Sequence, residues 1–166
     1  MDKIAPILLA FILGVIATLF VSSQLKKSPE VKTIVLPLLI TPTPSMLQLV
    51  NTAREDARVE PLTENEKLDR SAKRKACDMA KRDYFEHKDP DGLFSWHLFR
   101  KAGYNYEFAG ENLVQNTSTP TEDMEMLMDS PEHKENILNP NFKEVGIGKC
   151  GIYLVQHFGS LAKGGE

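Results

Sequence analysis

Cysteine is scarce in this sequence, and a local redox or metal motif is missing. The 166 residues hold two cysteines, Cys77 and Cys150, which are too far apart in the chain to form a CxxC pair. The sequence therefore offers no basis for a thioredoxin-like redox site or a zinc knuckle. Two cysteines are compatible with one disulfide in an exported protein, or with two inert thiols in a reducing compartment.

A positive charge excess is also missing. Lysine and arginine together number 20, against 23 aspartate and glutamate residues, which gives a formal net charge of -3. Nucleic-acid-binding proteins usually carry a strong basic excess. The local basic run Lys73-Arg74-Lys75 lies among acidic residues, a pattern typical of a solvated helix face. We therefore expect no nucleic-acid partner.

Charged residues are absent from residues 4–21, an apolar run of eighteen residues. That length reaches the lower limit for spanning a bilayer, and the run lacks the polar face of a soluble core helix. Residues 1–25 are therefore predicted to be a signal-anchor, which is a transmembrane helix, or a signal peptide cut after Ser23. The run is longer than the apolar region of most cleaved signals, which favours the anchor and a membrane partner.

Residues 26–44 are predicted to be a proline-containing linker. Pro37 interrupts a short apolar run at residues 34–40 and confines any strand there to a sheet edge. The segment Thr41-Pro42-Thr43-Pro44 is typical of an extended, stiff spacer. The globular domain is expected over residues 45–160, followed by a short tail at residues 161–166.

Three helix starts are evident in the globular part. Ser45 is suited to cap a first helix. Thr63 with Glu66, and Thr119 with Glu122, each form a capping box that predicts the start of a further helix. The helix expected after Thr63 carries an apolar stripe at helical spacing, formed by Leu68, Ala72, Ala76 and Met79.

Short strands are predicted between and after the helices. They are expected at residues 108–114, 145–150 and 152–158, and Gly151 joins the last two in a tight turn. Gly103 is placed to end a short helix around residues 94–99, and Pro131 to open another helix that carries His133. Helices combined with about three strands indicate an α+β fold, with an antiparallel sheet covered by helices.

Two histidines and one acid, His87, Glu111 and His133, each lie more than twenty residues from the next. The tertiary fold has to build any site that they share. Two imidazoles and a carboxylate are the usual protein part of an open zinc site, and the same groups suit general acid–base work near neutral pH. A local motif such as HExxH is absent. Glu111 has a competing structural role, in which its carboxylate braces backbone N–H groups of a tight turn.

The other two histidines are predicted to be structural. His97 lies beside Trp96 in a short helix, where the edge of the core is expected. His157 lies between Gln156 and Phe158 on the last strand and is expected to face solvent.

Several short segments occur in a fixed order along the chain. They are Asn51-Thr52-Ala53-Arg54, Tyr84-Phe85-Glu86-His87, Asp89-Pro90-Asp91-Gly92, Ala109-Gly110-Glu111-Asn112, Ser130-Pro131-Glu132-His133-Lys134-Glu135-Asn136, Val145-Gly146-Ile147-Gly148 and Gln156-His157-Phe158-Gly159. In this order they resemble the CAP superfamily, or SCP domain, of cysteine-rich secretory proteins, antigen 5 and plant pathogenesis-related proteins. The chain is similar to its compact bacterial members, and the resemblance runs from Leu47 to Phe158.

The resemblance implies a three-layer α-β-α sandwich around a central antiparallel sheet. It also implies a cleft with two histidines and two acidic residues, in which His87, His133 and Glu111 fill three positions. Ser130 stands where longer family members have the second acid, and Glu132 is the alternative for that fourth position. We interpret Ser130 as the N-cap of the following helix, and Glu132 as a solvent-facing residue of its first turn.

The predicted function is that of an extracytoplasmic CAP domain, membrane-tethered or, if the signal is cleaved, secreted. It is expected to be a binding or cell-envelope module for a protein, lipid or cell-wall ligand. Its cleft of His87, Glu111 and His133 is suited to hold a divalent metal, with zinc as the candidate. The alternative is a peptidase-like hydrolase in which these residues activate water, or His133 activates Ser130. A third hypothesis is a pure interaction scaffold. We favour binding because an activated nucleophile is not evident in the sequence.

Overall fold

The computed structural model describes residues 42–164. The predicted anchor or signal peptide at residues 1–25 and most of the predicted linker lie outside the described residues. Within residues 42–164, none of the helices combines the length and the apolar character that crossing a bilayer requires.

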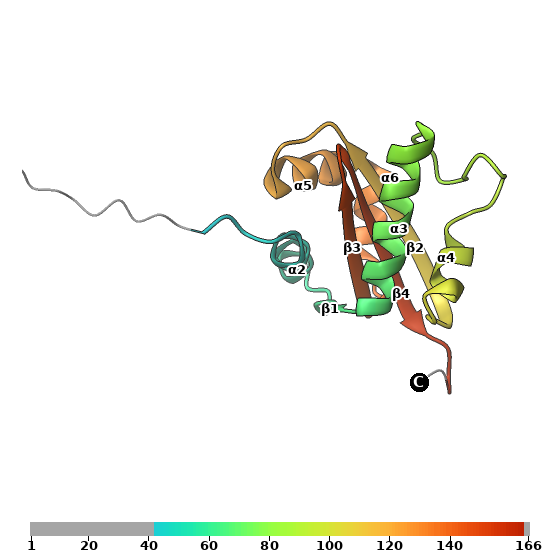
Figure 1. Ribbon diagram of the computed structural model, residues 1–166. Helices are drawn as coiled ribbons and strands as arrows, with labels where there is room; N and C mark the ends of the chain where they lie inside the picture. The colour runs from blue at the N-terminus through green and yellow to red at the C-terminus, as the bar shows by residue number, and fades with distance from the viewer. Residues whose placement is uncertain (1–41, 165–166) are drawn as a thin grey trace, which may run out of the picture. The chain divides into compact units, whose positions relative to one another are not determined.

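Helices and strands follow one another along the described residues (Figure 1). The helices are α2 (Met46–Asp56), α3 (Glu66–Arg82), α4 (Trp96–Lys101), α5 (Pro120–Asp129) and α6 (Pro131–Leu138). The strands are β1 (Thr63–Glu64), β2 (Tyr106–Gln115), β3 (Glu144–Cys150) and β4 (Tyr153–Leu161). Ser45 and Thr119 cap α2 and α5 through capping boxes, which confirms the helix starts predicted there.

The sheet is mixed rather than wholly antiparallel. Its strand order is β1-β3-β4-β2, and β4 runs antiparallel to both β3 and β2. The prediction of an antiparallel sheet is wrong at β1, which runs parallel to β3. The Thr63 N–H donates to the carbonyl of Lys143 at 3.0 Å, and the Asn65 N–H donates to that of Val145 at 3.0 Å. These bonds join the chain to the sheet before α3 begins.

Thr63 is therefore not the helix N-cap that its capping-box pattern predicts. Helix α3 begins at Glu66, and Asn65 is the N-cap. The Asn65 side chain accepts from the N–H of Lys67 at 2.9 Å and from that of Leu68 at 3.4 Å. Asparagine is a strong N-cap because its side-chain oxygen satisfies a free N–H of the first turn. Thr63 is held in β1 instead.

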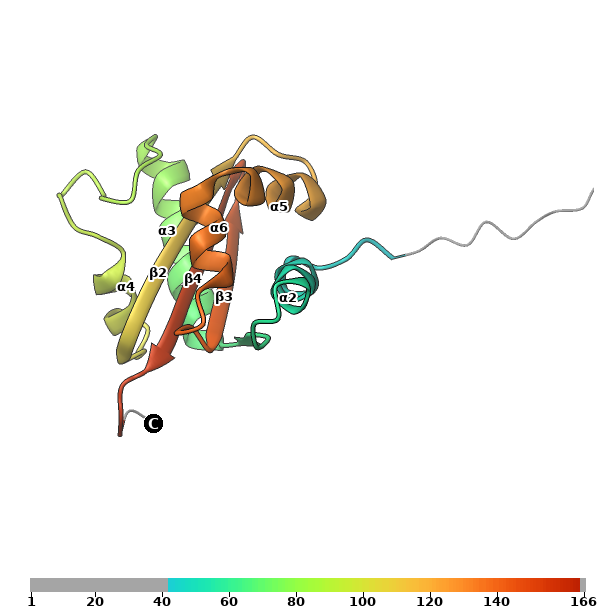
Figure 2. The same ribbon diagram turned by 180° about the vertical axis from the view of Figure 1, so that it is seen from behind.

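Helices cover both faces of the sheet and give the three layers that the resemblance implies (Figure 1, Figure 2). Helices α3 and α4 lie on one face, and α2, α5 and α6 lie on the other. Leu127 and Ile137 belong to the core cluster beneath α2, α5 and α6. On the opposite face the predicted α3 stripe is buried, with Ala72, Ala76 and Met79 in one cluster with sheet residues. The central strand β4 is consequently buried from Tyr153 to Gly159.

Two glycines of β3 let α3 lie close to the sheet. A Cβ added to Gly148 would come within 2.1 Å of the Lys73 backbone nitrogen, and one added to Gly146 within 2.1 Å of the Leu68 carbonyl carbon. The obstacle in both cases is helix backbone, which cannot move aside as a flexible side chain can. These glycines therefore set the distance between α3 and the sheet.

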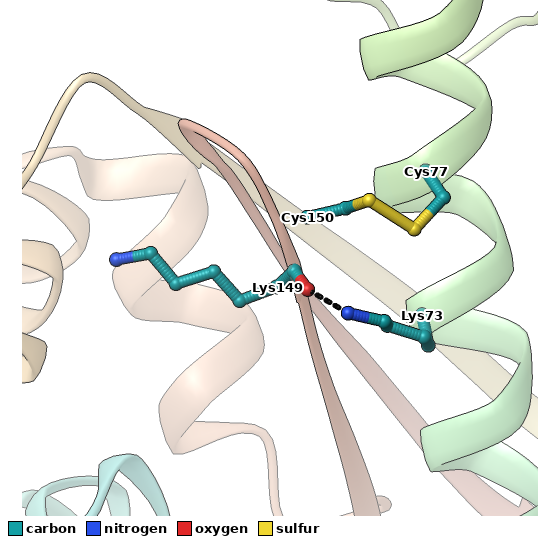
Figure 3. The surroundings of a disulfide bond; sticks show 4 residues. All are labelled: Lys73, Cys77, Lys149 and Cys150. Carbon is teal, nitrogen blue, oxygen red and sulfur yellow. Dashed lines mark hydrogen bonds between the residues drawn. A yellow bond between two sulfur atoms is a disulfide. The ribbon is translucent and has the colours of Figure 1, made fainter.

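The two cysteines form a disulfide that ties α3 to the end of β3 (Figure 3). The Cα atoms of Cys77 and Cys150 are 5.0 Å apart, at a sequence separation of 73. Lys73 donates to the carbonyl of Lys149 beside the bridge, while the Lys149 side chain extends away from it. Of the two interpretations that the sequence leaves open, the structure shows the disulfide. A disulfide is consistent with an extracytoplasmic domain, because disulfides persist in oxidising compartments.

Arg54 of α2 connects that helix to the end of α6. Its side chain is fully buried. The guanidinium donates to the carbonyls of Ile137 at 2.7 Å, Asn139 at 3.0 Å and Phe142 at 3.3 Å. These bonds fix the C-terminal end of α6, the helix that carries His133.

Candidate functional site

Glu111 of β2 is the centre of a buried hydrogen-bond network. Its side chain is 3% exposed, and both carboxylate oxygens accept from protein groups. Oε1 accepts from His87 Nδ1 at 2.8 Å, and Oε2 accepts from Ser95 Oγ at 2.5 Å and from His157 Nε2 at 2.8 Å. Burial alone would raise the pKa of Glu111, but the hydrogen bonds from His157 and His87 outweigh it and hold the pKa at about 2. The carboxylate is therefore ionised at neutral pH.

His87 lies in the loop after α3, and its side chain is 53% exposed. Because an ionised carboxylate can only accept hydrogen bonds, the neutral imidazole carries its proton on Nδ1 and leaves Nε2 open. The hydrogen bond to Glu111 raises the pKa of His87. A carboxylate behind an imidazole fixes its orientation and tautomer, as it does for histidines that bind metals or act as bases.

His157 is fully buried, so the prediction that it faces solvent is wrong. The reason is the position of β4 in the centre of the sheet, with helices on both faces. His157 is paired with Glu111 in the β2–β4 register, and its Nε2–H donates to that carboxylate. Burial lowers the pKa of His157 and keeps the ring neutral, and Nδ1 lies 2.7 Å from Ser71 Oγ of α3. Glu111 thus braces side chains, not the backbone of a turn.

A buried lysine holds the loop that carries His87. Lys75 of α3 is 1% exposed, and its Nζ donates to the His87 carbonyl at 3.0 Å and to Tyr84 Oη at 3.4 Å. Burial lowers the pKa of Lys75, while the charge of Glu111 acts in the opposite direction. The loop is anchored to α3 by this ammonium group.

His133 reaches the site from the other helical layer. It lies on α6, whereas Glu111 contacts groups of the α3 layer. Strand β2 is the last strand of the sheet, so the two layers meet over its edge. Asn112 Nδ2 donates to the His133 carbonyl at 3.0 Å, and Asn136 Nδ2 donates to the Glu111 carbonyl at 3.2 Å. These amides hold α6 against the edge of β2.

Three side chains at the start of α6, those of Ser130, Glu132 and His133, belong to the predicted site. Burial, followed by the charge of His87, lowers the pKa of His133, and the charge of Glu132 acts in the opposite direction. Glu132 is exposed. Ser130 occupies the N-cap position of α6, but its side chain makes no capping hydrogen bond. The two imidazoles are therefore close enough to influence each other electrostatically.

A groove of about 400 Å³ follows the edge of β2 beside His133. Phe85 from the α3 side, Leu113 and Gln115 from β2, and Met126, Leu127 and Ser130 from the opposite side contribute to its lining. A larger hollow of about 870 Å³ lies along the exposed side of α3, but it opens widely to solvent and is lined by charges of both signs. Of the three predicted site residues, His133 lines the groove and none lines the larger hollow, so we place the candidate site at the β2 edge.

A three-ligand metal site is not assembled in the described part of the chain. Among residues 42–164, no group of three His, Cys, Asp or Glu side chains is arranged to hold a metal ion. Both Glu111 oxygens are engaged by protein groups, so His87 and His133 are the members of the predicted set with open nitrogens. The zinc set of His87, Glu111 and His133 stays a prediction.

Sequence reasoning missed four members of this network, Ser71, Lys75, Ser95 and His157. His157 carried a signal, since it belongs to a run of otherwise mostly apolar residues, where a polar side chain needs a buried partner. Nothing in the sequence marked Ser71, Ser95 or Lys75 as site residues, because serine and lysine are common on exposed surfaces.

The sequence of this chain matches a known family over the region that builds the site. Residues 47–157 match the Cysteine-rich secretory protein family, CAP. The chain belongs to the CAP family. Every member of the Glu111 network lies inside the matched range, as does His133. The resemblance inferred from the sequence is thereby confirmed.

A bacterial relative shows the extent of the shared region. The uncharacterized protein YkwD of Bacillus subtilis strain 168 is 36% identical to this chain over 115 residues. The aligned part makes up 68% of this chain and 45% of YkwD. The chain thus spans less than half the length of this relative.

Solved structures share the CAP fold. An extracellular protein with an SCP domain from Bacillus anthracis str. Ames has a TM-score of 0.67 at 23% identity, covering 69% of this chain and 38% of that one. An outer surface protein from Borrelia burgdorferi has a TM-score of 0.66 at 17% identity, covering 70% and 90%. A cysteine-rich secretory protein from Staphylococcus aureus subsp. aureus Mu50 has a TM-score of 0.56 at 17% identity, covering 68% and 36%. At these identities the likeness establishes the fold.

Proposed function

We propose that this CAP domain is an extracytoplasmic module that binds a component of the cell envelope. Similar proteins are described as extracellular, outer-surface or secretory, which supports this location. The disulfide between Cys77 and Cys150 supports it too, because it fits an oxidising compartment. Residues 1–25 tether the domain to a membrane as a signal-anchor, or direct its secretion if they are cleaved.

One observation carries the assignment to binding: the buried Glu111 carboxylate fixes a half-exposed imidazole, His87, at the β2 edge. Phe85, two residues before His87, lines the partly apolar groove, and apolar surface with a few oriented polar groups nearby is the usual composition of a ligand site. The Ser130 hydroxyl, by contrast, makes no hydrogen bond to an imidazole among the described residues. The activated nucleophile of a serine hydrolase therefore has no support at that position.

Sedimentation of the full chain with isolated cell envelopes tests this function. We expect retention of the wild type, and about tenfold weaker retention of Glu111→Gln, because loss of the charge leaves His87 poorly oriented. Glu107→Gln is the matched control, since Glu107 is an exposed acid on the same strand. Equal retention of wild type and Glu111→Gln contradicts a role for this site. Protection of the domain from added protease on intact cells contradicts the extracytoplasmic location.

A divalent metal, with zinc as the candidate, would bind through the open nitrogens of His87 and His133, because both oxygens of Glu111 already accept hydrogen bonds. In this arrangement Glu111 stands behind His87 and raises its basicity, as carboxylates behind metal-binding histidines do. The metal would supply a positive charge for an anionic ligand group. Calorimetric titration of the full chain with zinc should show binding that weakens below about pH 6.5, where imidazoles become protonated. Undiminished zinc binding by the His87→Gln/His133→Gln double variant excludes this site.

The second candidate is a hydrolase, and the hydrogen bond between His87 and Glu111 is the observation in its favour. An imidazole oriented by a carboxylate is suited to take a proton from water. A screen with peptide and cell-wall substrates tests this alternative. Turnover that survives in His87→Gln contradicts a base role for His87, and turnover that survives in Glu111→Gln contradicts the orienting role of the carboxylate.

A further inference from the structure

We propose that the groove at the β2 edge binds an extended peptide, which pairs with Leu113 and Gln115 as an additional strand of the sheet. The inference rests on the proposed function and names the ligand class of the same site. Pairing of a peptide with an exposed sheet edge draws on main-chain hydrogen bonds for affinity and on pockets for alternate side chains for specificity.

The first support is the direction of the main-chain groups of β2. The Asn116 N–H, just after β2, donates to the carbonyl of Ile152, just before β4, at 3.1 Å, so Asn116 faces the neighbouring chain. Hydrogen-bonded and non-bonded pairs alternate along an antiparallel ladder. Leu113 and Gln115, which are paired with Val155 and Tyr153, therefore direct their N–H and C=O groups away from β4.

The second support is that only part of this edge is protected. A register irregularity lies between Tyr106 and Phe108 at the start of β2, and Asn136 occupies the outward carbonyl of Glu111. Bulges, prolines and charged side chains are the usual devices that prevent an edge from pairing. The stretch Leu113-Val114-Gln115 has none of these devices, and α6 does not cap its carbonyls through side-chain hydrogen bonds.

The third support is the groove itself, which surrounds this open stretch. Leu113 is 5% exposed at its base, whereas Phe85 and Met126 on either side are 38% and 53% exposed. Outward main-chain groups at the base of a groove require partners, because a buried N–H or C=O without one is costly. A peptide strand satisfies these groups and places alternate apolar side chains against Phe85 and Met126.

The open stretch of the edge favours a single peptide over a second copy of this domain. Its outward main-chain groups lie at Leu113, which is 5% exposed, and at Gln115, in a groove that Phe85 and Met126 also line. A single extended chain is narrow enough to follow so short and recessed a stretch. It would run past Ser130 and His133, which line the same groove.

Gln115 offers a sharp test, because proline removes its outward N–H without removing a bond to β4. Proline is tolerated on edge strands where the N–H faces away from the sheet. The probe is a randomised library of hexapeptides with blocked ends, selected on the full chain in lipid nanodiscs and measured by fluorescence anisotropy. We expect selected peptides to bind wild type and the control Glu107→Gln equally, since Glu107 is an exposed residue of β2 outside the groove, and to bind Gln115→Pro at least tenfold more weakly.

The peptide provides a second measurement that does not depend on the folding of Gln115→Pro. N-methylation at alternate residues of a selected peptide should weaken binding at least tenfold in one register and leave it unchanged in the other, because only alternate N–H groups face the edge. Failure to select any peptide, or equal tolerance of N-methylation in both registers, overturns the proposal. Dimers of the chain that dissociate in Gln115→Pro overturn it in favour of a second copy.

The peptide-binding result and the envelope-retention result can be distinguished. If envelope retention depends on Glu111 but no peptide is selected, peptide recognition alone is wrong. If peptides bind in the predicted register but envelopes are not retained, the peptide groove stands and the envelope assignment falls.

Discussion

His157 donates a hydrogen bond to Glu111 over 2.8 Å, between side chains that are 0% and 3% exposed. The two residues are 46 positions apart in the sequence and directly opposite each other in the β2–β4 ladder. A buried carboxylate is tolerated only when donors surround it. His157 is therefore a condition for placing Glu111 behind His87.

Replacement of His157 by phenylalanine should destabilise the fold by about 1–3 kcal/mol, because it removes one donor from a buried acceptor. Urea unfolding of the full chain measures the change. His157→Gln is the matched variant, since its amide keeps an N–H for Glu111 and should recover part of the loss. Equal stability of wild type and His157→Phe would show that the hydrogen bond contributes nothing to stability.

Stability should fall in acid. The pKa of Glu111 is depressed from 4.5 to about 2 in the folded state, so its contribution is present above about pH 4.5 and is lost as pH falls towards 2. The size of this loss is about 3 kcal/mol. The lowered pKa of His157 acts in the same direction, because the unfolded chain binds that proton below about pH 6.5. His87, with its raised pKa, acts in the opposite direction, since its contribution is lost as pH rises.

The measurement for this prediction is the free energy of unfolding at several pH values between 7 and 2. In His157→Gln the decrease between about pH 6.5 and 4.5 should shrink, while the later decrease assigned to Glu111 persists. A wild-type stability that stays constant down to pH 3 is incompatible with an ionised, buried Glu111.

Loss of the disulfide should cost about 4 kcal/mol, because the bridge between Cys77 and Cys150 closes a loop with a sequence separation of 73. Thermal unfolding of the full chain with and without a reducing agent measures the difference. The Cys77→Ala/Cys150→Ala variant is the control, and reduction should leave its melting temperature unchanged. A wild type that is equally stable when reduced contradicts a stabilising role for the bridge.

Gly148→Ala should be severely destabilising, by about 3 kcal/mol or more, because the new Cβ meets the backbone of α3 at 2.1 Å. Gly151→Ala is the comparison. Its φ of +60° is strained for alanine, but nothing lies within 4 Å of the added Cβ, so the cost should be about 1 kcal/mol. Chemical unfolding of both variants decides whether close packing or backbone conformation is the stronger constraint. Equal costs would show that α3 moves away readily.

Local rules predicted much of the fold. Ser45 and Thr119 cap their helices as expected, since a cap depends on residues within one turn. The α3 stripe is buried as expected, since helical periodicity reveals which face is apolar. The prediction that Thr63 caps α3 was wrong because Thr63 and Asn65 are both suitable N-cap residues. Pairing with β3 holds Thr63 in the sheet and leaves Asn65 as the N-cap.

By itself, the sequence determined the family, the order of the helices and of β2, β3 and β4, and the identity of His87, Glu111 and His133 as candidate residues, but it missed β1. It left open whether Cys77 and Cys150 form a disulfide, and it wrongly predicted that His157 faces solvent. Only the tertiary structure decided these points, because they depend on which strand lies in the centre of the sheet and which lies at its edge. A central strand hides His157 behind two helical layers, where it holds Glu111 in place. At the edge strand, His87 contacts Glu111 from one helical layer, and His133 from the opposite layer lines the groove.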